Sequence, residues 1–181
     1  MAHDWVAPRI NSGDSVIDAT LGNGHDTVFL AQLVGEDGRV FAFDVQSEAL
    51  ESAKEKLDKA GLSSQCRLVL DGHENLAGHV GDAKVKAVMF NLGYLPGSDK
   101  SCITRAETTV AALQNALACL DTEGIITLVV YVGHPGGMEE AASVLKFCEN
   151  LDSEKFRSVR YDPLNSRKAA PFFIGIESLT N

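Results

Sequence analysis

The stretch 16–27, which reads V-I-D-A-T-L-G-N-G-H-D-T, constrains the fold more than any other part of the chain. It predicts a short apolar strand that ends in the carboxylate of Asp18, turns through Gly22 and Gly24, and enters a helix near the end of the stretch. Glycines let a backbone approach a ligand closely, and the free N–H groups of a helix N-terminus attract polar or anionic groups. The stretch therefore predicts a ligand-binding turn.

The same stretch differs from the dinucleotide-binding fingerprint in two respects. The pattern G-x-G-x-x-G requires a small residue at the position of Thr27, and the preceding strand does not normally end in an acid such as Asp18. An acid at this place favours a ligand that carries a positive charge or hydroxyl donors. An NAD-binding module is the alternative interpretation of the turn.

Apolar strands and amphipathic helices alternate along the chain. Each of the first five strands leads into a helical pattern, whereas the last two strands follow each other directly and are expected to pair antiparallel. This order predicts an α/β fold with a mostly parallel seven-stranded sheet, an antiparallel C-terminal strand and helices on both faces. Residues 1–181 are expected to form a single domain. The expected strands are 16–18, 39–43, 66–70, 85–90, 124–132, 156–161 and 171–177.

The spacing of apolar residues also predicts which face of each helix is buried. Ser47 is expected to cap a helix that ends at Gly61. In two later helices apolar residues recur every three or four positions, which is typical of a helix with one buried face. The expected buried positions are Ala106, Val110, Leu113, Leu117 and Leu120 in the first of these helices, and Met138, Ala141, Leu145 and Cys148 in the second.

Composition and charge exclude several classes of function. A net charge of −9 argues against broad, sequence-independent nucleic-acid binding, because such binding depends on neutralising phosphates. No apolar run approaches the roughly 20 residues of a membrane span, and the N-terminus lacks the basic and apolar regions of a signal peptide. We therefore expect a cytoplasmic protein with no membrane association. The cysteines are widely spaced without a C-x-x-C pair, so we expect reduced thiols and no metal site.

Polar residues and glycines gather where the predicted strands end. In open parallel sheets ligands bind beyond the carboxyl ends of the strands, so these segments are expected to meet at one edge. Acids and glycines at strand ends are also common turn formers and caps, which is the alternative interpretation of each one. The segments are 18–25, residue 44, 71–74, 91–94 and 133–137.

Asp44 follows the glycine turn by about 20 positions and ends the second strand, where nucleotide-binding folds place the carboxylate that accepts hydrogen bonds from ribose hydroxyls. Together with Asp18, which could face an amino-acid ammonium directly or through water, this pattern suits S-adenosylmethionine better than NAD. Asp71 is placed to reach the adenine amine. A turn formed by Asp71 and Gly72 is the alternative.

The segment N-L-G-Y, residues 91–94, is expected to supply the methyl-transfer chemistry. It resembles the N-P-P-Y type motif of methyltransferases that modify amino nitrogens, in which the Asn side chain and a following carbonyl accept hydrogen bonds from the amine. Such bonds orient the nitrogen lone pair toward the methyl group, and orientation is the main gain in this reaction. The alternatives are that Asn91 is a turn cap and that Tyr94 is an ordinary packed aromatic residue.

Three histidines lie in strand-end loops and are candidates for accepting a proton from an ammonium substrate. For each of them the alternative is a histidine that fixes the loop through hydrogen bonds. The three candidates are His25, His73 and His134.

Four segments in this order, D-A-T-L-G-N-G-H-D-T, F-A-F-D-V-Q, F-N-L-G-Y-L-P-G-S-D-K and V-V-Y-V-G-H-P-G-G, resemble the family labelled putative rRNA methylases. Members of that family are identified as tRNA methyltransferases acting on 5-aminomethyl-2-thiouridine at the wobble position. The resemblance covers roughly residues 3–177. It implies a Rossmann-like class I methyltransferase fold, S-adenosylmethionine as methyl donor, a tRNA anticodon stem-loop as substrate, and a homodimer.

The resemblance also implies roles for particular residues. Asn91, Leu92, Gly93 and Tyr94 fall at the methyl-transfer site. For the function of the whole protein two alternatives stay open. One is a methyltransferase that acts on rRNA or another amine, and the other is a non-catalytic nucleotide- or RNA-binding module. The expected cofactor-binding residues are Asp18, Thr20, Gly22, Asn23, Gly24, His25, Asp26, Thr27, Asp44, Gln46, Asp71, Gly72, His73 and Asn91.

Overall fold

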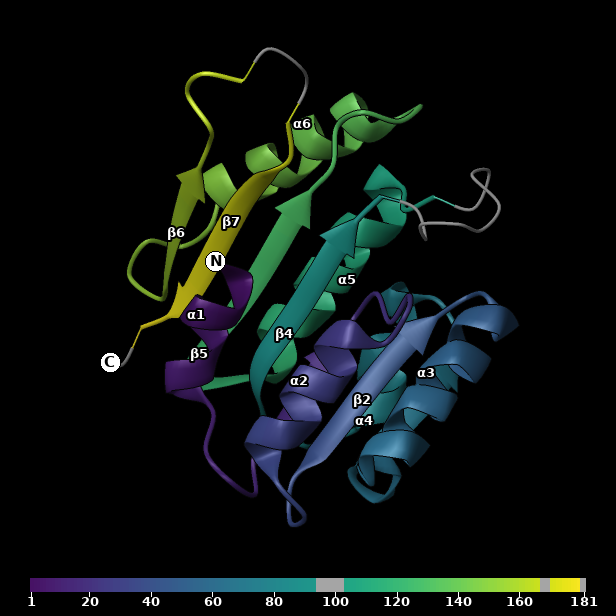
Figure 1. The fold of residues 1–181 in the computed structure, drawn as a ribbon. Coiled ribbons are helices and arrows are strands. Elements are labelled where there is room, and N and C mark those ends of the chain that lie inside the picture. Colours follow the sequence, from purple (N-terminus) through teal and green to yellow (C-terminus); the bar gives the residue numbers. More distant parts are fainter. Residues whose placement is uncertain (94–102, 167–169, 180–181) are drawn as a thin grey trace.

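A computed structural model describes residues 1–93, 103–166 and 170–179 (Figure 1). Its seven-stranded sheet has the order β3-β2-β1-β4-β5-β7-β6. The strands are β1 (Ser15–Asp18), β2 (Arg39–Asp44), β3 (Cys66–Leu70), β4 (Val85–Leu92), β5 (Leu120–Val130), β6 (Phe156–Tyr161) and β7 (Phe172–Ser178). The helices are α1 (Ala2–Val6), α2 (His25–Val34), α3 (Ser47–Ala60), α4 (Leu76–Val80), α5 (Ala106–Cys119) and α6 (Gly137–Glu149), with short 3-10 turns η1 (Ala7–Arg9), η2 (Ser63–Gln65) and η3 (His73–Asn75).

The strand directions confirm the predicted sheet. Strands β1 to β5 run parallel, and β7 pairs antiparallel with both β5 and β6. Strand β1 is central, and Ile17 lies between Phe41 of β2 and Val88 of β4. Because helices cover both faces of the sheet, the central strands are apolar on both sides.

Side chains alternate between two core layers along each strand. Val16, Val40 and Met89 pack toward α1 and α2, while Ile17 and Phe90 belong to the layer against α4, α5 and α6. This alternation follows from the two-residue period of a strand. Figure 1 shows α1 and α2 on one face of the sheet and α5 and α6 on the other. None of the helices in the described part of the chain is long and apolar enough to cross a membrane.

Several predicted boundaries need correction. Helix α3 is capped by Gln46, not Ser47, because Gln46 has an extended backbone (φ −104°, ψ 121°) and Ser47 is already helical. Strand β4 continues through Leu92, two residues beyond its predicted end, because the ladder with β5 persists to that point. Strand β5 spans 120–130 rather than the predicted 124–132.

The buried faces of α5 and α6 also differ from the prediction. In α5 only Leu113 of the predicted helical positions is fully buried, because small side chains let the helix approach the sheet on a neighbouring stripe. In α6 Met138 is 68% exposed, and the buried stripe instead contains Glu140. The observed buried residues are Thr109, Ala112, Leu113, Ala116 and Cys119 in α5, and Gly137, Glu140, Ala141, Val144 and Cys148 in α6.

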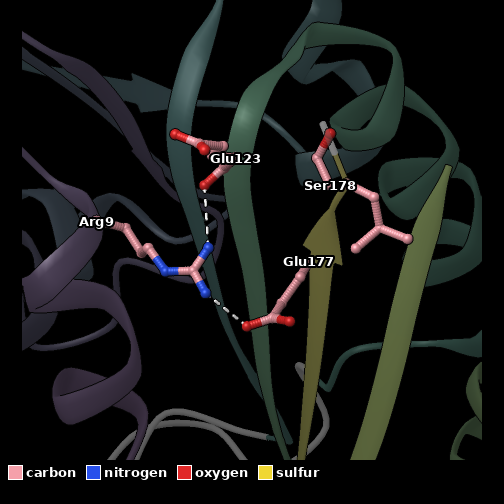
Figure 2. A pocket seen from close by; sticks show the side chains of 5 residues that line it. Arg9, Glu123, Glu177 and Ser178 are labelled. Atoms are coloured by element: carbon pink, nitrogen blue, oxygen red, sulfur yellow. Dashed lines mark hydrogen bonds and ion pairs between the residues drawn. The ribbon is translucent and has the colours of Figure 1, made fainter. Parts of the chain in front are cut away.

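The N-terminal segment is fixed to the end of the sheet that carries β5 and β7. Trp5 of α1 lies over Gly175 of β7, where an added Cβ would come within 2.6 Å of the Trp5 ring, and it meets the Phe173 ring at 5.3 Å. Figure 2 shows Arg9 reaching from η1 toward β5 and β7: it donates to Glu177 Oε1 at 2.6 Å and to the Glu123 carbonyl at 3.3 Å. Arg9, Glu123 and Glu177 line a small pocket of about 370 Å³. Together the contacts of Trp5 and Arg9 hold the N-terminal segment against β5 and β7.

Candidate functional site

A cavity of about 940 Å³ opens where β1, β2, β3 and β4 end. Its wall includes the loops after these strands, residues 103–105, Thr108 of α5, and Tyr131, which follows β5. The structure thus brings together the strand-end segments that were predicted to meet, except for 133–137, which does not line this cavity. The predicted site residues in the wall are Thr20, Gly22, Asn23, His25, Asp26, Asp44, Gln46, Asp71, Gly72, His73, Asn91 and Gly93.

Other predicted residues lie behind the wall. Asp18 is fully buried: its Oδ2 accepts a hydrogen bond from Thr27 Oγ1 at 2.6 Å, and its Oδ1 accepts one from the Thr20 N–H at 3.2 Å. Gly24 caps α2 with a positive φ of 74°, and an added Cβ would lie 2.7 Å from Ala53 Cβ. Asp18 and Gly24 therefore support the turn from the side that faces the protein interior. Leu92 is buried in the sheet, and Tyr94 lies outside the described residues.

The ionisation of Asp18 differs from that of an ordinary carboxylate. Burial raises its pKa to about 7, and the nearby Asp26 carboxylate adds to the rise. An unpaired charge in a dry position is costly, so the proton is retained well above the ordinary pKa. Asp18 thus keeps its proton to a much higher pH than an ordinary aspartate does.

Replacing Asp18 by asparagine is expected to remove a pH-dependent loss of stability. An unfolded aspartate ionises near pH 3.8, but folded Asp18 keeps its proton until about pH 7. Between these values only the unfolded state releases the proton, so the wild-type free energy of unfolding falls as pH rises, by an amount on the order of 4 kcal/mol. Asp18→Asn is therefore expected to gain stability relative to wild type across this range.

Urea denaturation at several pH values between about 4.5 and 8 measures this difference. Asp152→Asn is the control of opposite sign. The pKa of exposed Asp152 is lowered, and the largest cause is the hydrogen bond that its carboxylate accepts from the Glu154 N–H. The stability that ionised Asp152 contributes is therefore lost as pH falls. A difference between Asp18→Asn and wild type that stays constant with pH would contradict the role of Asp18 burial.

Asp44 joins two loops of the cavity. Its Oδ2 accepts a hydrogen bond from the Gly22 N–H at 2.9 Å, and its Oδ1 accepts one from the Gln46 N–H at 3.0 Å. A carboxylate has about four lone-pair positions, so each oxygen can accept a further hydrogen bond from a ligand. The side chain lines the cavity and is therefore both a brace for the glycine turn and a candidate acceptor for hydroxyl groups.

Asp71 is held in a fixed orientation at the end of β3. It accepts hydrogen bonds from Asn75 Nδ2, His79 Nε2 and the Gly72 N–H, each at 2.8 Å. The hydrogen bond from His79 is the main reason that the pKa of Asp71 lies below its ordinary value. Asp71 is therefore an ionised acceptor in the cavity wall, as well as the turn-forming residue that the Asp-Gly pair predicts.

The three candidate histidines occupy different environments. His73 is 8% exposed, its Nδ1 lies 3.2 Å from the Ala19 carbonyl, and burial lowers its pKa, so its neutral form is favoured. Its Nε2 is buried in the cavity wall without a hydrogen-bond partner in the described part of the chain. His25 lines the cavity with its Nε2 3.3 Å from Lys56 Nζ, whereas His134 does not line it.

Asn91 lies at the end of β4 in the cavity wall, inside the strand rather than in the turn that follows. Its backbone N–H donates to Thr20 Oγ1 at 2.7 Å, and its side-chain Nδ2 donates to Asp26 Oδ2 at 2.7 Å. Main chain and side chain are thus both anchored to the turn and helix that follow β1. This rigidity is what a group that orients a substrate requires.

Sequence reasoning missed some residues of the site. Glu140 of α6 is 1% exposed and accepts hydrogen bonds from Thr104 Oγ1 at 2.8 Å and Thr109 Oγ1 at 2.6 Å. It holds the chain at Thr104, which lines the cavity, against α6. His3 of α1 bonds to Asp26. Local patterns could not reveal these pairs, because their members lie far apart in the sequence. Tyr131, which lines the cavity, is the tyrosine of the V-V-Y-V-G-H-P-G-G segment and could have been suspected.

Comparisons with known proteins agree with this geometry. The family described as "Putative rRNA methylase" matches residues 40–177. A protein of Arabidopsis thaliana named tRNA (mnm(5)s(2)U34)-methyltransferase, chloroplastic, is 40% identical over 183 residues; the alignment covers 96% of this chain and 66% of that protein, so the chain spans slightly less than two thirds of this relative.

Two solved structures are close in both fold and sequence. A "putative rRNA-methylase" from Clostridium thermocellum has a TM-score of 0.96 at 47% identity, with 98% of this chain and 95% of that chain covered. A "putative methyltransferase" from Streptococcus mutans, solved in complex with SAH, has a TM-score of 0.90 at 38% identity, with 98% and 96% covered. The chain therefore belongs to the family described as "Putative rRNA methylase", and its fold is the Rossmann-like fold of S-adenosylmethionine-dependent methyltransferases.

Proposed function

We propose that this S-adenosylmethionine-dependent methyltransferase methylates the aminomethyl nitrogen of 5-aminomethyl-2-thiouridine at the wobble position of tRNA. The observation that carries the proposal is the anchoring of Asn91 in the cavity wall, with its amide hydrogen committed to Asp26. The name of the Arabidopsis thaliana relative, which specifies mnm5s2U34 of tRNA, supports the choice of substrate.

The cavity fits S-adenosylmethionine. Its volume of about 940 Å³ lies within the usual range of ligand pockets, roughly 300 to 1,000 Å³. Asp44 would accept hydrogen bonds from the ribose hydroxyls, and Asp71 with Gly72 would meet the adenine. The turn between Thr20 and Asp26 would hold the methionyl part. When bound, the cofactor supplies a methyl group on a positively charged sulfur.

Asn91, at the end of β4, would act on the acceptor. An amine attacks only when its lone pair points at the methyl carbon, so the enzyme gains mainly by restricting its orientation. An acceptor N–H that donates to Asn91 Oδ1 would restrict the direction in which the nitrogen lone pair points. The transfer would form a bond between this nitrogen and the methyl carbon, and the electron pair of the broken carbon–sulfur bond would stay on sulfur.

Mass spectrometry of nucleosides tests the proposed substrate. The purified protein, S-adenosylmethionine and tRNA bearing 5-aminomethyl-2-thiouridine are expected to yield 5-methylaminomethyl-2-thiouridine. Ribosomal RNA prepared from the cells that supply the tRNA serves as the competing substrate. Methylation of rRNA but not of tRNA would contradict the proposed substrate. In a strain that lacks the gene, an unchanged level of methylaminomethyl-thiouridine in tRNA would contradict it as well.

The proposal includes an anticodon stem-loop as the bound RNA and a homodimer as the working form. The wobble base is unpaired, so it can enter the cavity without opening a duplex. This mode of binding needs few phosphate contacts, which agrees with the net charge of −9. Light scattering on the purified protein, with and without a stem-loop RNA, measures the mass of each species.

A further inference from the structure

Three polar side chains from three separate elements form a continuous chain at the methyl-transfer end of the cavity. His3 of α1 places its Nε2 2.6 Å from Asp26 Oδ1, and Asp26 Oδ2 accepts the hydrogen bond from Asn91 Nδ2 at 2.7 Å. The imidazole of His3 also stacks on Phe29 of α2, with ring centroids 3.7 Å apart and planes 5° from parallel. The helix at the N-terminus is thus connected to the end of β4 through a single carboxylate.

The hydrogen bonds among His3, Asp26 and Asn91 fix the orientation of the Asn91 amide. An ionised carboxylate only accepts hydrogen bonds, so the edge of Asn91 that faces Asp26 must be the NH2 group. The carbonyl oxygen Oδ1 therefore lies on the opposite edge of the amide. If the amide were flipped, two oxygen atoms would face each other, so Asp26 holds Asn91 in the one orientation that presents an acceptor to an amine.

The same reasoning fixes the role of His3. Because Asp26 accepts, Nε2 of His3 must carry the hydrogen between them, whatever the state of the other ring nitrogen. The stack on Phe29 restricts rotation of the imidazole. The side chain of Asp26 is 18% exposed and that of His3 is 45% exposed, so His3 forms the outer end of the chain. With both oxygens of Asp26 engaged, the carboxylate cannot rotate away from Asn91.

We propose that Asp26 and His3 are positioning residues for methyl transfer, which hold the Asn91 amide so that its oxygen accepts the acceptor N–H. This inference rests on the proposed function for the identity of the acceptor. It assigns Asp26 to the methyl-transfer site in addition to the cofactor's methionyl part. It also gives α1, whose other contacts are structural, a direct influence on the reaction.

Single-turnover kinetics of variants tests the proposal. His3→Ala is expected to lower the rate constant about tenfold with unchanged affinity for S-adenosylmethionine, since a poorly held amide orients fewer acceptors. His3→Gln restores an N–H donor at nearly the same reach and is expected to recover most of the rate. Asp4→Ala is the matched control, because Asp4 lies on the same helix and is 83% exposed.

A double-mutant cycle separates positioning from general damage. If His3 acts through Asn91, the His3→Ala substitution should lower the single-turnover rate constant less than about twofold when Asn91 has already been replaced by serine. A tenfold loss in both backgrounds would overturn the proposal, because His3 would then act independently of Asn91. An equal loss in Asp4→Ala would overturn it as well, since displacement of α1 would explain the effect.

A second readout needs no RNA. In protein labelled with 15N-asparagine, the Asn91 side-chain signals are identified by their loss in Asn91→Ser. They are expected to shift in His3→Ala and in Asp26→Ala but not in Asp4→Ala, and unshifted signals would overturn the proposal. Wild-type enzyme that fails to methylate tRNA would reject the proposed substrate, and this spectrum alone would then decide whether His3 and Asp26 hold Asn91.

Discussion

Asn91→Ala is expected to lower the rate constant of methyl transfer by at least roughly 100-fold, the scale of loss when a reacting group is no longer oriented. The affinity for S-adenosylmethionine should fall far less than the rate constant, because the predicted contacts to the ribose and adenine come from the loops after β2 and β3 and Asn91 is only one of the expected cofactor-binding residues. The fold should persist, since the backbone N–H of residue 91 keeps its bond to Thr20 Oγ1.

Single-turnover assays and calorimetry on the same preparation measure both quantities for Asn91→Ala. Asn150→Ala is a suitable control, because Asn150 also donates through its side-chain amide, to the Lys146 carbonyl at the end of α6. A rate constant within about threefold of wild type would remove Asn91 from the mechanism, since correct orientation is worth far more than that.

Asp44→Ala is expected to weaken the binding of S-adenosylmethionine by roughly 10- to 100-fold, corresponding to about 1.5–3 kcal/mol for hydrogen bonds to a charged group. Two effects combine. The ribose hydroxyls lose their acceptor, and the N–H groups of Gly22 and Gln46 lose the carboxylate that joins their loops. Asp44→Asn keeps one acceptor oxygen and should fall between wild type and the alanine variant.

Isothermal titration with S-adenosylmethionine and, separately, with NAD measures the effect of Asp44→Ala. Asp152→Ala removes a carboxylate that lies outside the cavity wall and should bind like wild type. Equal affinity of Asp44→Ala and wild type would show that the carboxylate does not meet the ribose. Binding of NAD with no binding of S-adenosylmethionine would favour the dinucleotide interpretation of the glycine turn.

The local parts of the fold could be predicted from the sequence. The strand over 66–70 matches the prediction, because a short apolar run that is followed by an acid and a glycine is a local signal. The gathering of Asp44, Asp71 and Asn91 around one cavity also follows from sequence order, since parallel strands place their carboxyl ends on one edge.

What the sequence could not show depends on distant partners. Glu140 looks like a solvent-facing acid in the first turn of a helix, and its burial depends on hydrogen bonds from the hydroxyl groups of Thr104 and Thr109. The same burial turns α6 and exposes Met138, which hydrophobic spacing alone had placed inward. The pairing of His3 with Asp26 likewise depends on where the sheet places α1.

The attachment of α1 to the last strand has a consequence for the order in which the protein is assembled. Helix α1 is synthesised before all seven strands, but Trp5 rests on Gly175 and Arg9 is paired with Glu177, residues of the last strand in chain order, β7. Such long-range contacts form late in folding. A nascent chain that already carries the glycine turn and β4 therefore still lacks the contacts of Trp5 and Arg9 with β7, and α1 reaches its full attachment to the sheet only after β7 joins it.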